Sequence, residues 1–137
     1  MKIPGIYAIY YCNVEDFDIG NTDIIKNIHN SDKIITSAVW NIVDKVGFPA
    51  ISEDMVVQNG QNVYSVDLSW FSLEPVMLSK KVFRIEDVNG RNFIIGTKDK
   101  PYAVFSRHFS EAGPTQKKGY ECKVKYKNTH GLIEVIV

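Results

Sequence analysis

The segment KKVFRIEDVNGRNFIIGTKDKPYAVF, residues 80–105, decides the fold, because it predicts two antiparallel strands joined at Asn89-Gly90. Asn-Gly is the strongest short-range signal for a two-residue type I′ turn, in which both central residues have positive φ. That turn places Glu86 opposite Phe93 across the hairpin. One face then carries Phe83, Ile85 and Ile94, and the other carries Val82, Arg84, Glu86, Phe93 and Ile95. Both faces are apolar, and an isolated hairpin is too small to bury two faces.

The second face of this hairpin is an apolar surface with charged residues at its edge, a pattern found at protein–protein interfaces. We therefore predict an interface with Phe93 and Ile95 at its centre and Val82 beside them, rimmed by Arg84 and Glu86. The alternative is a second sheet of the same chain that covers this face. The two differ in the effect of Phe93→Asp, which leaves a folded monomer at an interface but unfolds the protein at a core position.

Regular alternation of apolar and polar residues predicts further strands, each with one buried face. Residues 64–70 alternate after the turn signal QNGQN, and residues 120–126 alternate with the apolar side chains facing inward. A turn at residues 128–131, with Gly131 in the left-handed conformation, is predicted to close a final hairpin that places Lys125 opposite Glu134. Apolar strands are also predicted at residues 3–14 and 102–105.

Two segments of the N-terminal third have helical apolar spacing. Ile24, Ile25 and Ile28 share one helical face, which predicts a short helix over residues 23–29 capped by Asn21 or Thr22. Residues 31–46 have helical apolar spacing with Ser31 or Asp32 as a cap, but most of their apolar residues are β-branched and favour a strand, so both alternatives stay open. The sequence thus predicts a mainly β (α+β) fold: an antiparallel β-sandwich or small barrel of about seven strands with a short helical insertion near the N-terminus.

Length and composition indicate one domain over residues 1–137, with 45% apolar and 23% charged residues, as in ordinary globular proteins. No apolar run approaches the ~20 residues of a membrane span, so no membrane partner is expected. The start, MKIPGIYAIYYC, lacks a small-residue cleavage site and predicts a first strand rather than a signal peptide. Cys12 and Cys122 lack CxxC spacing and are expected to be buried thiols in the cytoplasm.

The zero net charge hides an asymmetry between the two halves of the chain. Residues 1–75 carry four lysines and ten acids, a net charge of −6, and residues 76–137 carry twelve bases and six acids, a net charge of +6. Opposite charges of this kind attract each other within one molecule or between neighbouring copies. A basic face suited to phosphate is a further possibility.

No catalytic or metal-binding pattern is apparent in the sequence, so we predict a protein that is not an enzyme and uses no cofactor. His29, His108 and His130 lie on different predicted elements without ligand spacing. The tripeptide Ser106-Arg107-His108 does not by itself predict a catalytic pair. The stretch DFDIGNTD resembles the start of a calcium loop but has Asn27 at the position of the final glutamate, which favours a solvated loop.

Nucleic-acid binding is the alternative function that composition supports. Arg107, Lys123, Lys125 and Lys127 accompany the aromatic residues Tyr102, Phe105 and Phe109, the combination with which OB-like barrels bind single strands. The same lysines are equally explained as a solvated face that protects a sheet edge from aggregation.

The segments NGQNVYSVDLSWFS (residues 59–72) and FRIEDVNGRNFIIGTKDKPYAVF (residues 83–105) resemble small structural proteins of phages and prophages of gut bacteria. The resemblance covers residues 59–137 and implies a non-enzymatic virion component of the tail, neck or connector kind. It also implies self-association or contact with other virion proteins, in the cytoplasm during assembly and then in the virion. In this comparison residues 31–46 are more strand than helix, and no catalytic residues are implied.

Overall fold

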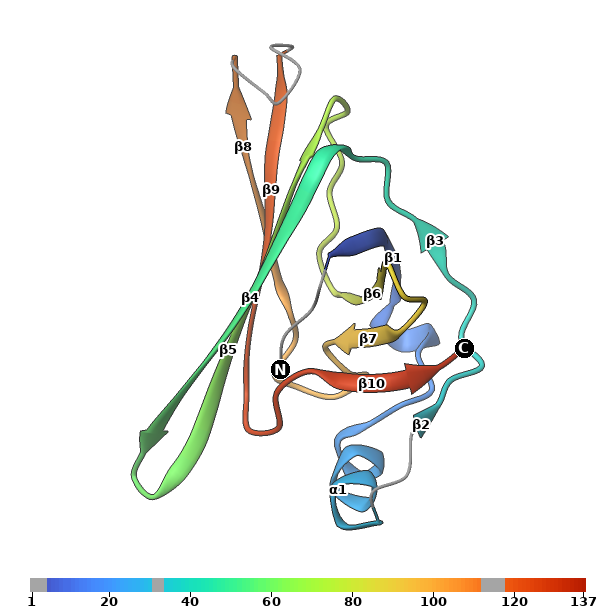
Figure 1. Cartoon of the computed structure of the whole chain (residues 1–137), viewed down its shortest axis with the longest axis vertical. Coiled ribbons are helices and arrows are strands. Elements are labelled where there is room, and N and C mark those ends of the chain that lie inside the picture. The colour runs from blue at the N-terminus through green and yellow to red at the C-terminus, as the bar shows by residue number, and fades with distance from the viewer. Residues whose placement is uncertain (1–4, 31–33, 112–117) are drawn as a thin grey trace.

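Two β-sheets lie face to face in the computed structural model (Figure 1), which describes residues 5–30, 34–111 and 118–137 and, within these, no side chains for residues 27–30. Sheet A consists of β1 (Ile6–Asn13), β2 (Ile34–Ile35), β3 (Asn41–Ile42), β6 (Lys81–Asp87), β7 (Asn92–Ile95) and β10 (Ile133–Ile136), in the order β2-β10-β7-β6-β1-β3. Sheet B consists of β4 (Val46–Gln58), β5 (Gln61–Ser72), β8 (Val104–Ser110) and β9 (Gly119–Asn128), in the order β4-β5-β9-β8. The remaining elements are the 3₁₀ turn η1 (Val14–Asp16) and the helix α1 (Asn21–Asn30). The predicted mainly β sandwich with a short helical insertion is confirmed.

The alternating segments form the centre of sheet B. In β5, Val66, Leu68 and Trp70 are buried, and β9 alternates between buried and exposed residues along most of its length. β5 pairs with β9, so the acidic first half of the chain and the basic second half meet inside one molecule, with Asp67 opposite Lys125. The intramolecular explanation of the charge asymmetry therefore accounts for at least this contact.

The β6–β7 hairpin has a different register from the predicted one. Ile85 rather than Glu86 lies opposite Phe93. The turn has three residues instead of two: the Gly90 N–H donates to the Asp87 carbonyl (3.1 Å) and the Asp87 N–H donates to the Arg91 carbonyl (2.9 Å). Gly90 has φ 81°, which together with these bonds forms a type I turn followed by a bulge.

Asp87 explains this turn, because its side chain accepts hydrogen bonds from the backbone N–H groups of Asn89 (2.9 Å) and Arg91 (2.8 Å). The type I′ turn occurs instead at Asn59-Gly60, between β4 and β5, where φ is 51° and 79°. A shift of one residue regroups the side chains of the hairpin, since neighbouring residues of a strand point to opposite faces.

Both faces of the β6–β7 hairpin are covered within the chain. The core between the two sheets contains Phe83, Ile85, Phe93 and Ile95 from the hairpin and Val66, Leu68, Trp70, Val124 and Tyr126 from sheet B. A second core lies on the other face of sheet A, where Val82 and Ile94 pack with Phe17, Ile19 and Ile24. The segment around η1 and the helix α1 thus forms a third layer beneath sheet A.

The predicted final hairpin does not form, because β9 belongs to sheet B whereas β10 pairs with β7 and β2 in sheet A. The turn itself has the expected chemistry: the Asn128 side chain accepts from the His130 N–H (3.0 Å), and Gly131 has φ 79°. After this turn the chain crosses to the other sheet, and the Leu132 N–H donates to the Glu53 carboxylate (2.7 Å). Glu134 pairs with Arg91 (2.9 Å) rather than lying opposite Lys125.

The helix α1 begins close to the predicted position but with a different cap. Gly20 precedes the first turn, its N–H donating to the Asp23 carboxylate (2.8 Å), and the Asn21 N–H donates to Asp99 (2.8 Å). No helix in the described part of the chain has the length and apolarity needed to cross a membrane.

Residues 34–46 contain no helix, so the helical alternative is wrong for them; they hold the short strands β2 and β3 and the first residue of β4 and are otherwise irregular. The proposed caps Ser31 and Asp32, the start of the first predicted strand and residues 112–117 of the predicted loop after β8 lie outside the described residues.

Candidate functional site

The interface predicted on the β6–β7 hairpin is wrong, because its residues are buried inside the chain. The side chains of Val82, Phe93 and Ile95 are 0% exposed. Phe93 and Ile95 pack beneath sheet B and Val82 packs in the second core beneath sheet A. The alternative of a second layer within the same chain is therefore correct for this surface.

Of the predicted charged rim of that interface, Arg84 is internal and Glu86 is partly buried. Arg84 is 7% exposed and its guanidinium lies 3.9 Å from the Tyr10 ring centroid and 5.2 Å from that of Trp40. One guanidinium nitrogen donates to the Asn92 side chain, and burial lowers the pKa of Arg84. Glu86 is half-buried and accepts a hydrogen bond from the Tyr10 hydroxyl (3.3 Å). These contacts cover part of the face of sheet A that points away from sheet B.

The predicted nucleic-acid contacts divide between two faces of sheet B. Lys123, Lys125 and Lys127 are exposed along the outer face of β9, as the alternation predicts. Arg107 lies opposite the buried Cys122 and thus on the inner face, where its guanidinium donates to the Val76 carbonyl (3.1 Å). The four basic residues do not form one surface.

The aromatic side chains of β8 are separated from the lysines in the same way. Phe105 lies opposite Val124 and Phe109 opposite Tyr120, on the face that carries Arg107. Phe109 makes an edge contact with the Tyr120 ring at 5.6 Å between centroids. The stacking platform expected of an OB-like binder is therefore not beside the lysine row.

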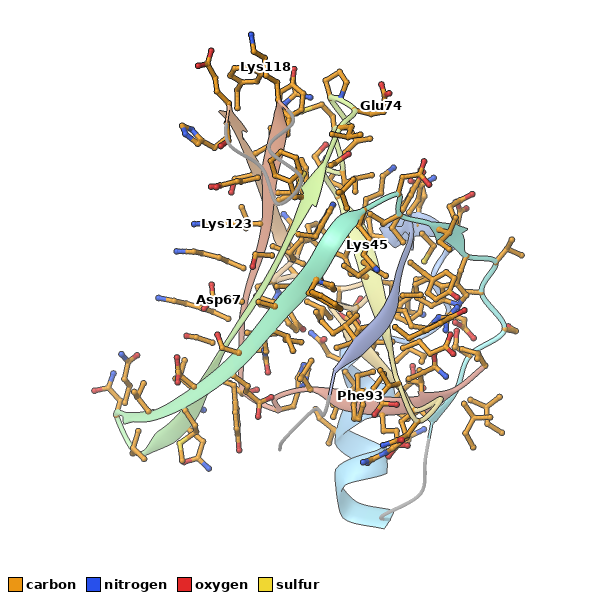
Figure 2. All side chains as sticks on the ribbon, turned by 45° about the horizontal axis from the view of Figure 1, so that its top comes forward. Lys45, Asp67, Glu74, Phe93, Lys118 and Lys123 are labelled. Atoms are coloured by element: carbon orange, nitrogen blue, oxygen red, sulfur yellow. The ribbon has the colours of Figure 1, made fainter. Side chains whose placement is uncertain are left out.

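The outer face of sheet B is polar and carries charges of both signs. In Figure 2 the labelled side chains of Asp67 and Lys123 point away from sheet A. A shallow hollow of about 340 Å³ on this sheet is lined by Ser52, Asp67, Leu68, Ser69, Lys123 and Lys125. The acids of sheet B are concentrated in β4 and β5, and its bases in β8 and β9.

The β4–β5 hairpin exposes apolar side chains that were not among the predicted site residues. It extends well beyond sheet A in Figure 1, and near its turn Met55, Val56 and Val57 are 50%, 51% and 66% exposed. We call these three residues the hairpin tip. At the other end of β4, Phe48 is fully exposed. The turn at QNGQN and the strand after it were predicted, whereas the strand before it, β4, was not, although Asn59-Gly60 flanked by apolar residues is a hairpin signal.

A cleft of about 410 Å³ lies where α1 meets the turn between β9 and β10. It is lined by Asn21, Ile24, Ile25, Pro101, Tyr126, Asn128, Thr129 and His130. His130 Nδ1 lies 2.7 Å from the Gly131 carbonyl oxygen. A carbonyl only accepts hydrogen bonds, so Nδ1 carries the proton, and the Tyr126 hydroxyl donates to Nε2 over 3.1 Å.

The Tyr126–His130 pair is uncharged at neutral pH. Burial raises the pKa of Tyr126 to about 12 and lowers the pKa of His130. The polar atoms on the α1 side of the cleft are also engaged, since the Asn21 side chain accepts from Thr97 (2.9 Å) and donates to the Lys100 carbonyl (3.1 Å). The cleft chiefly offers apolar contact with Ile24, Ile25 and Pro101, and the pair chiefly fixes the turn into β10.

Acidification is expected to destabilise the protein through His130. Its folded pKa is below the ordinary 6.5, so between those two values the unfolded chain binds a proton that the folded chain does not. Stability is full above about pH 6.5 and falls below it, by at most about 1.4 kcal/mol per pH unit. Urea unfolding at pH 7.5 and 5.5 measures this loss, which His130→Gln should diminish and the control His108→Gln should leave unchanged.

Other titratable groups in the described residues serve the fold. Cys12 and Cys122 are free and buried, as predicted, and burial raises the pKa of each thiol to about 11. Asp18 of the stretch DFDIGNTD accepts from the Thr36 hydroxyl (2.6 Å) and the Ser37 N–H (2.8 Å). Burial tends to raise the pKa of Asp18, but these hydrogen bonds outweigh it and lower the pKa. The part of the chain that the structure describes holds no group of three or more potential metal ligands.

Comparison of the chain with family models, curated proteins and solved structures gives no match in any of the three.

Proposed function

We propose that this chain is a non-enzymatic assembly protein that acts through protein–protein interfaces, in self-association or with other virion proteins. On the resemblance of residues 59–137, the assembly is a phage or prophage virion, of which the chain is a tail, neck or connector component. Such a protein accumulates in the cytoplasm during assembly and ends in the virion. The observation that best supports assembly is the apolar hairpin tip at the end of an open strand.

The hairpin tip supports an interface because nothing in the described chain covers it. Val57 is 66% exposed and Met55 is 50% exposed, although both are on the strand face that is partly buried farther along β4, at Ile51. Contiguous exposed apolar groups rimmed by polar residues mark interaction sites on soluble proteins. Here the rim consists of Asp54 on one side and Gln58 with Asn59 on the other. The buried β6–β7 hairpin plays no part in this proposal.

The lysine row of β9 supports nucleic-acid binding as the second candidate. Lys123, Lys125 and Lys127 are exposed on one face and regularly spaced, so they suit a row of phosphates. Asp67 directly opposite Lys125, and the position of Arg107 on the other face, weigh against this function. A single-stranded DNA titration decides it: binding that falls steeply with salt and is lost in Lys123→Glu with Lys125→Glu favours the second candidate.

Light scattering across a range of protein concentrations tests the assembly function. We expect a discrete oligomer, and Val57→Asp should weaken its association about tenfold or more, because a carboxylate would be desolvated in the interface. Val88→Asp is a matched control, since Val88 is also near a hairpin turn and is 61% exposed. A wild-type chain that stays monomeric at every concentration, alone and with candidate virion proteins, would refute the proposal.

A further inference from the structure

Sheet B ends in long open strands on both sides. Among the described residues β4 pairs only with β5, and β8 pairs only with β9. β4 has 13 residues and β8 has 7, whereas the end strands of sheet A, β2 and β3, have 2 residues each. An open edge presents backbone N–H and C=O groups, which are a template for a further strand.

Both open strands also present apolar side chains to solvent. On β4 Phe48 is 100% exposed, and on β8 Val104 and Phe109 are 64% and 49% exposed. Pro49 has no N–H to donate, and the pairing of β4 is irregular between Val46 and Ala50. The regular part of β4 from Ala50 onward is still longer than β8, so β8 can pair with it along residues 104–109.

The directions of β4 and β8 allow these two edges to pair when neighbouring copies have the same orientation. Each neighbouring pair in sheet B is antiparallel, in the order β4, β5, β9, β8. With four strands, β4 and β8 therefore run in opposite directions. When a second copy is placed beside the first in the same orientation, its β4 meets β8 of the first as an antiparallel pair, which continues the pattern of the sheet.

Charge favours the contact between unlike edges. The β4–β5 ribbon, residues 46–72, contains Glu53, Asp54 and Asp67 and no lysine or arginine, a net charge of −3. The β8–β9 ribbon, residues 104–110 and 119–128, contains Arg107, Lys123, Lys125 and Lys127 with Glu121, a net charge of +3. Pairing β4 with β4 or β8 with β8 would bring like charges together, whereas pairing β4 with β8 brings opposite charges together.

We propose that copies of this chain join head to tail, with the open edge of β4 in one copy paired with the open edge of β8 in the next. The proposal rests on the assembly function and names the partner as a second copy of the chain. Such a contact joins two different patches of neighbouring copies. Repeated from copy to copy, it forms a closed ring if the successive rotations return to the first copy, and an open filament otherwise.

Two variants reverse the net charge of each edge strand itself, from −2 to +1 in β4 and from +1 to −1 in β8, while keeping favourable pairs inside the sheet. Ser52→Lys with Asp54→Lys makes β4 basic, and Ser52 lies opposite Asp67. Val104→Glu with Ser106→Glu makes β8 acidic, and these two residues lie opposite Lys125 and Lys123. All four positions are exposed, so each variant should fold, which circular dichroism checks. Val88→Glu serves as a control for a change of net charge away from both edges.

Light scattering at low salt is then measured for each variant alone and for an equal mixture. Head-to-tail pairing predicts that each variant alone associates about tenfold or more weakly than the wild type, because its two edges now carry the same sign. It predicts that the mixture recovers the oligomer, since every contact between the two variants again joins opposite signs.

Two results would overturn the head-to-tail contact while leaving the assembly function intact. If the β8 variant kept the wild-type oligomer and only the β4 variant dissociated, the contact would involve β4 but not β8. If both variants kept it, neither edge would be the interface. A wild-type chain that never associates is a different outcome, and it removes the assembly function itself.

Discussion

Phe93→Asp is expected to abolish the folded state rather than to release a folded monomer. The Phe93 side chain is 0% exposed and lies in the core between the two sheets, opposite Ile85. Removing a buried phenylalanine side chain costs about 3–5 kcal/mol, and the substituted carboxylate must in addition be buried without a partner or force the layers apart. Since a domain of this size has about 5–15 kcal/mol of stability in total, this loss is enough to unfold it.

Far-ultraviolet circular dichroism and urea unfolding of the purified variant measure this loss directly. Val88→Asp is the matched control in the same hairpin, because Val88 is in its turn and 61% exposed, and its stability should stay within about 0.5 kcal/mol of the wild type. A cooperative unfolding transition near that of the wild type for Phe93→Asp would show that sheet B does not cover the hairpin.

Gly119→Ala is expected to destabilise the protein by about 3 kcal/mol, the upper end of the cost of overpacking. A Cβ atom at Gly119 would lie 2.6 Å from the Ser72 carbonyl oxygen and 2.7 Å from two ring carbons of Phe71. The Ser72 oxygen belongs to the backbone of the neighbouring strand and cannot move aside alone. The Phe71 ring, which is 5% exposed, covers Gly119 and has little room to turn.

Thermal and urea unfolding, measured in parallel for Gly119→Ala and Gly5→Ala, separates this clash from a general effect of replacing glycine. A Cβ at Gly5 would meet its nearest neighbour, a Val88 methyl, at 3.5 Å, an ordinary contact. Gly5→Ala should therefore change the stability little. Equal stabilities for the two variants would mean that β5 and β9 do not approach each other as closely at this point as the structure has them.

Local patterns predicted single strands well and predicted the contacts between strands poorly. The alternation of residues 120–126 identified the buried face of β9, because each strand alternates regardless of its partner. The register of the β6–β7 hairpin depended on hydrogen bonds from Asp87 that a turn dipeptide does not reveal. That single-residue error placed Phe93 and Ile95 on the wrong face and helped produce the mistaken interface.

The other incorrect predictions have a common physical cause, which is pairing between residues that are distant in the sequence. The turn at Asn128 has the same local chemistry whether the chain folds back or crosses to sheet A, and the choice is made by the pairing of Ile133 with Ile94. Likewise, grouping Arg107 with the lysines by composition ignored that it lies opposite Cys122 on the inner face. The exposure of Met55, Val56 and Val57 arises because the β4–β5 hairpin extends beyond sheet A (Figure 1), which the local pattern of β4 does not reveal.

Amide hydrogen exchange of the wild-type chain, measured below and above the concentration at which it associates, tests most directly whether sheet B is extended by other copies. Head-to-tail pairing predicts that association slows the exchange of amides in both β4 and β8, because backbone groups at both open edges gain partners. Exchange in the core strands β5 and β9, already paired on both sides, should change little. Association that leaves the exchange of both edge strands unchanged would contradict the account.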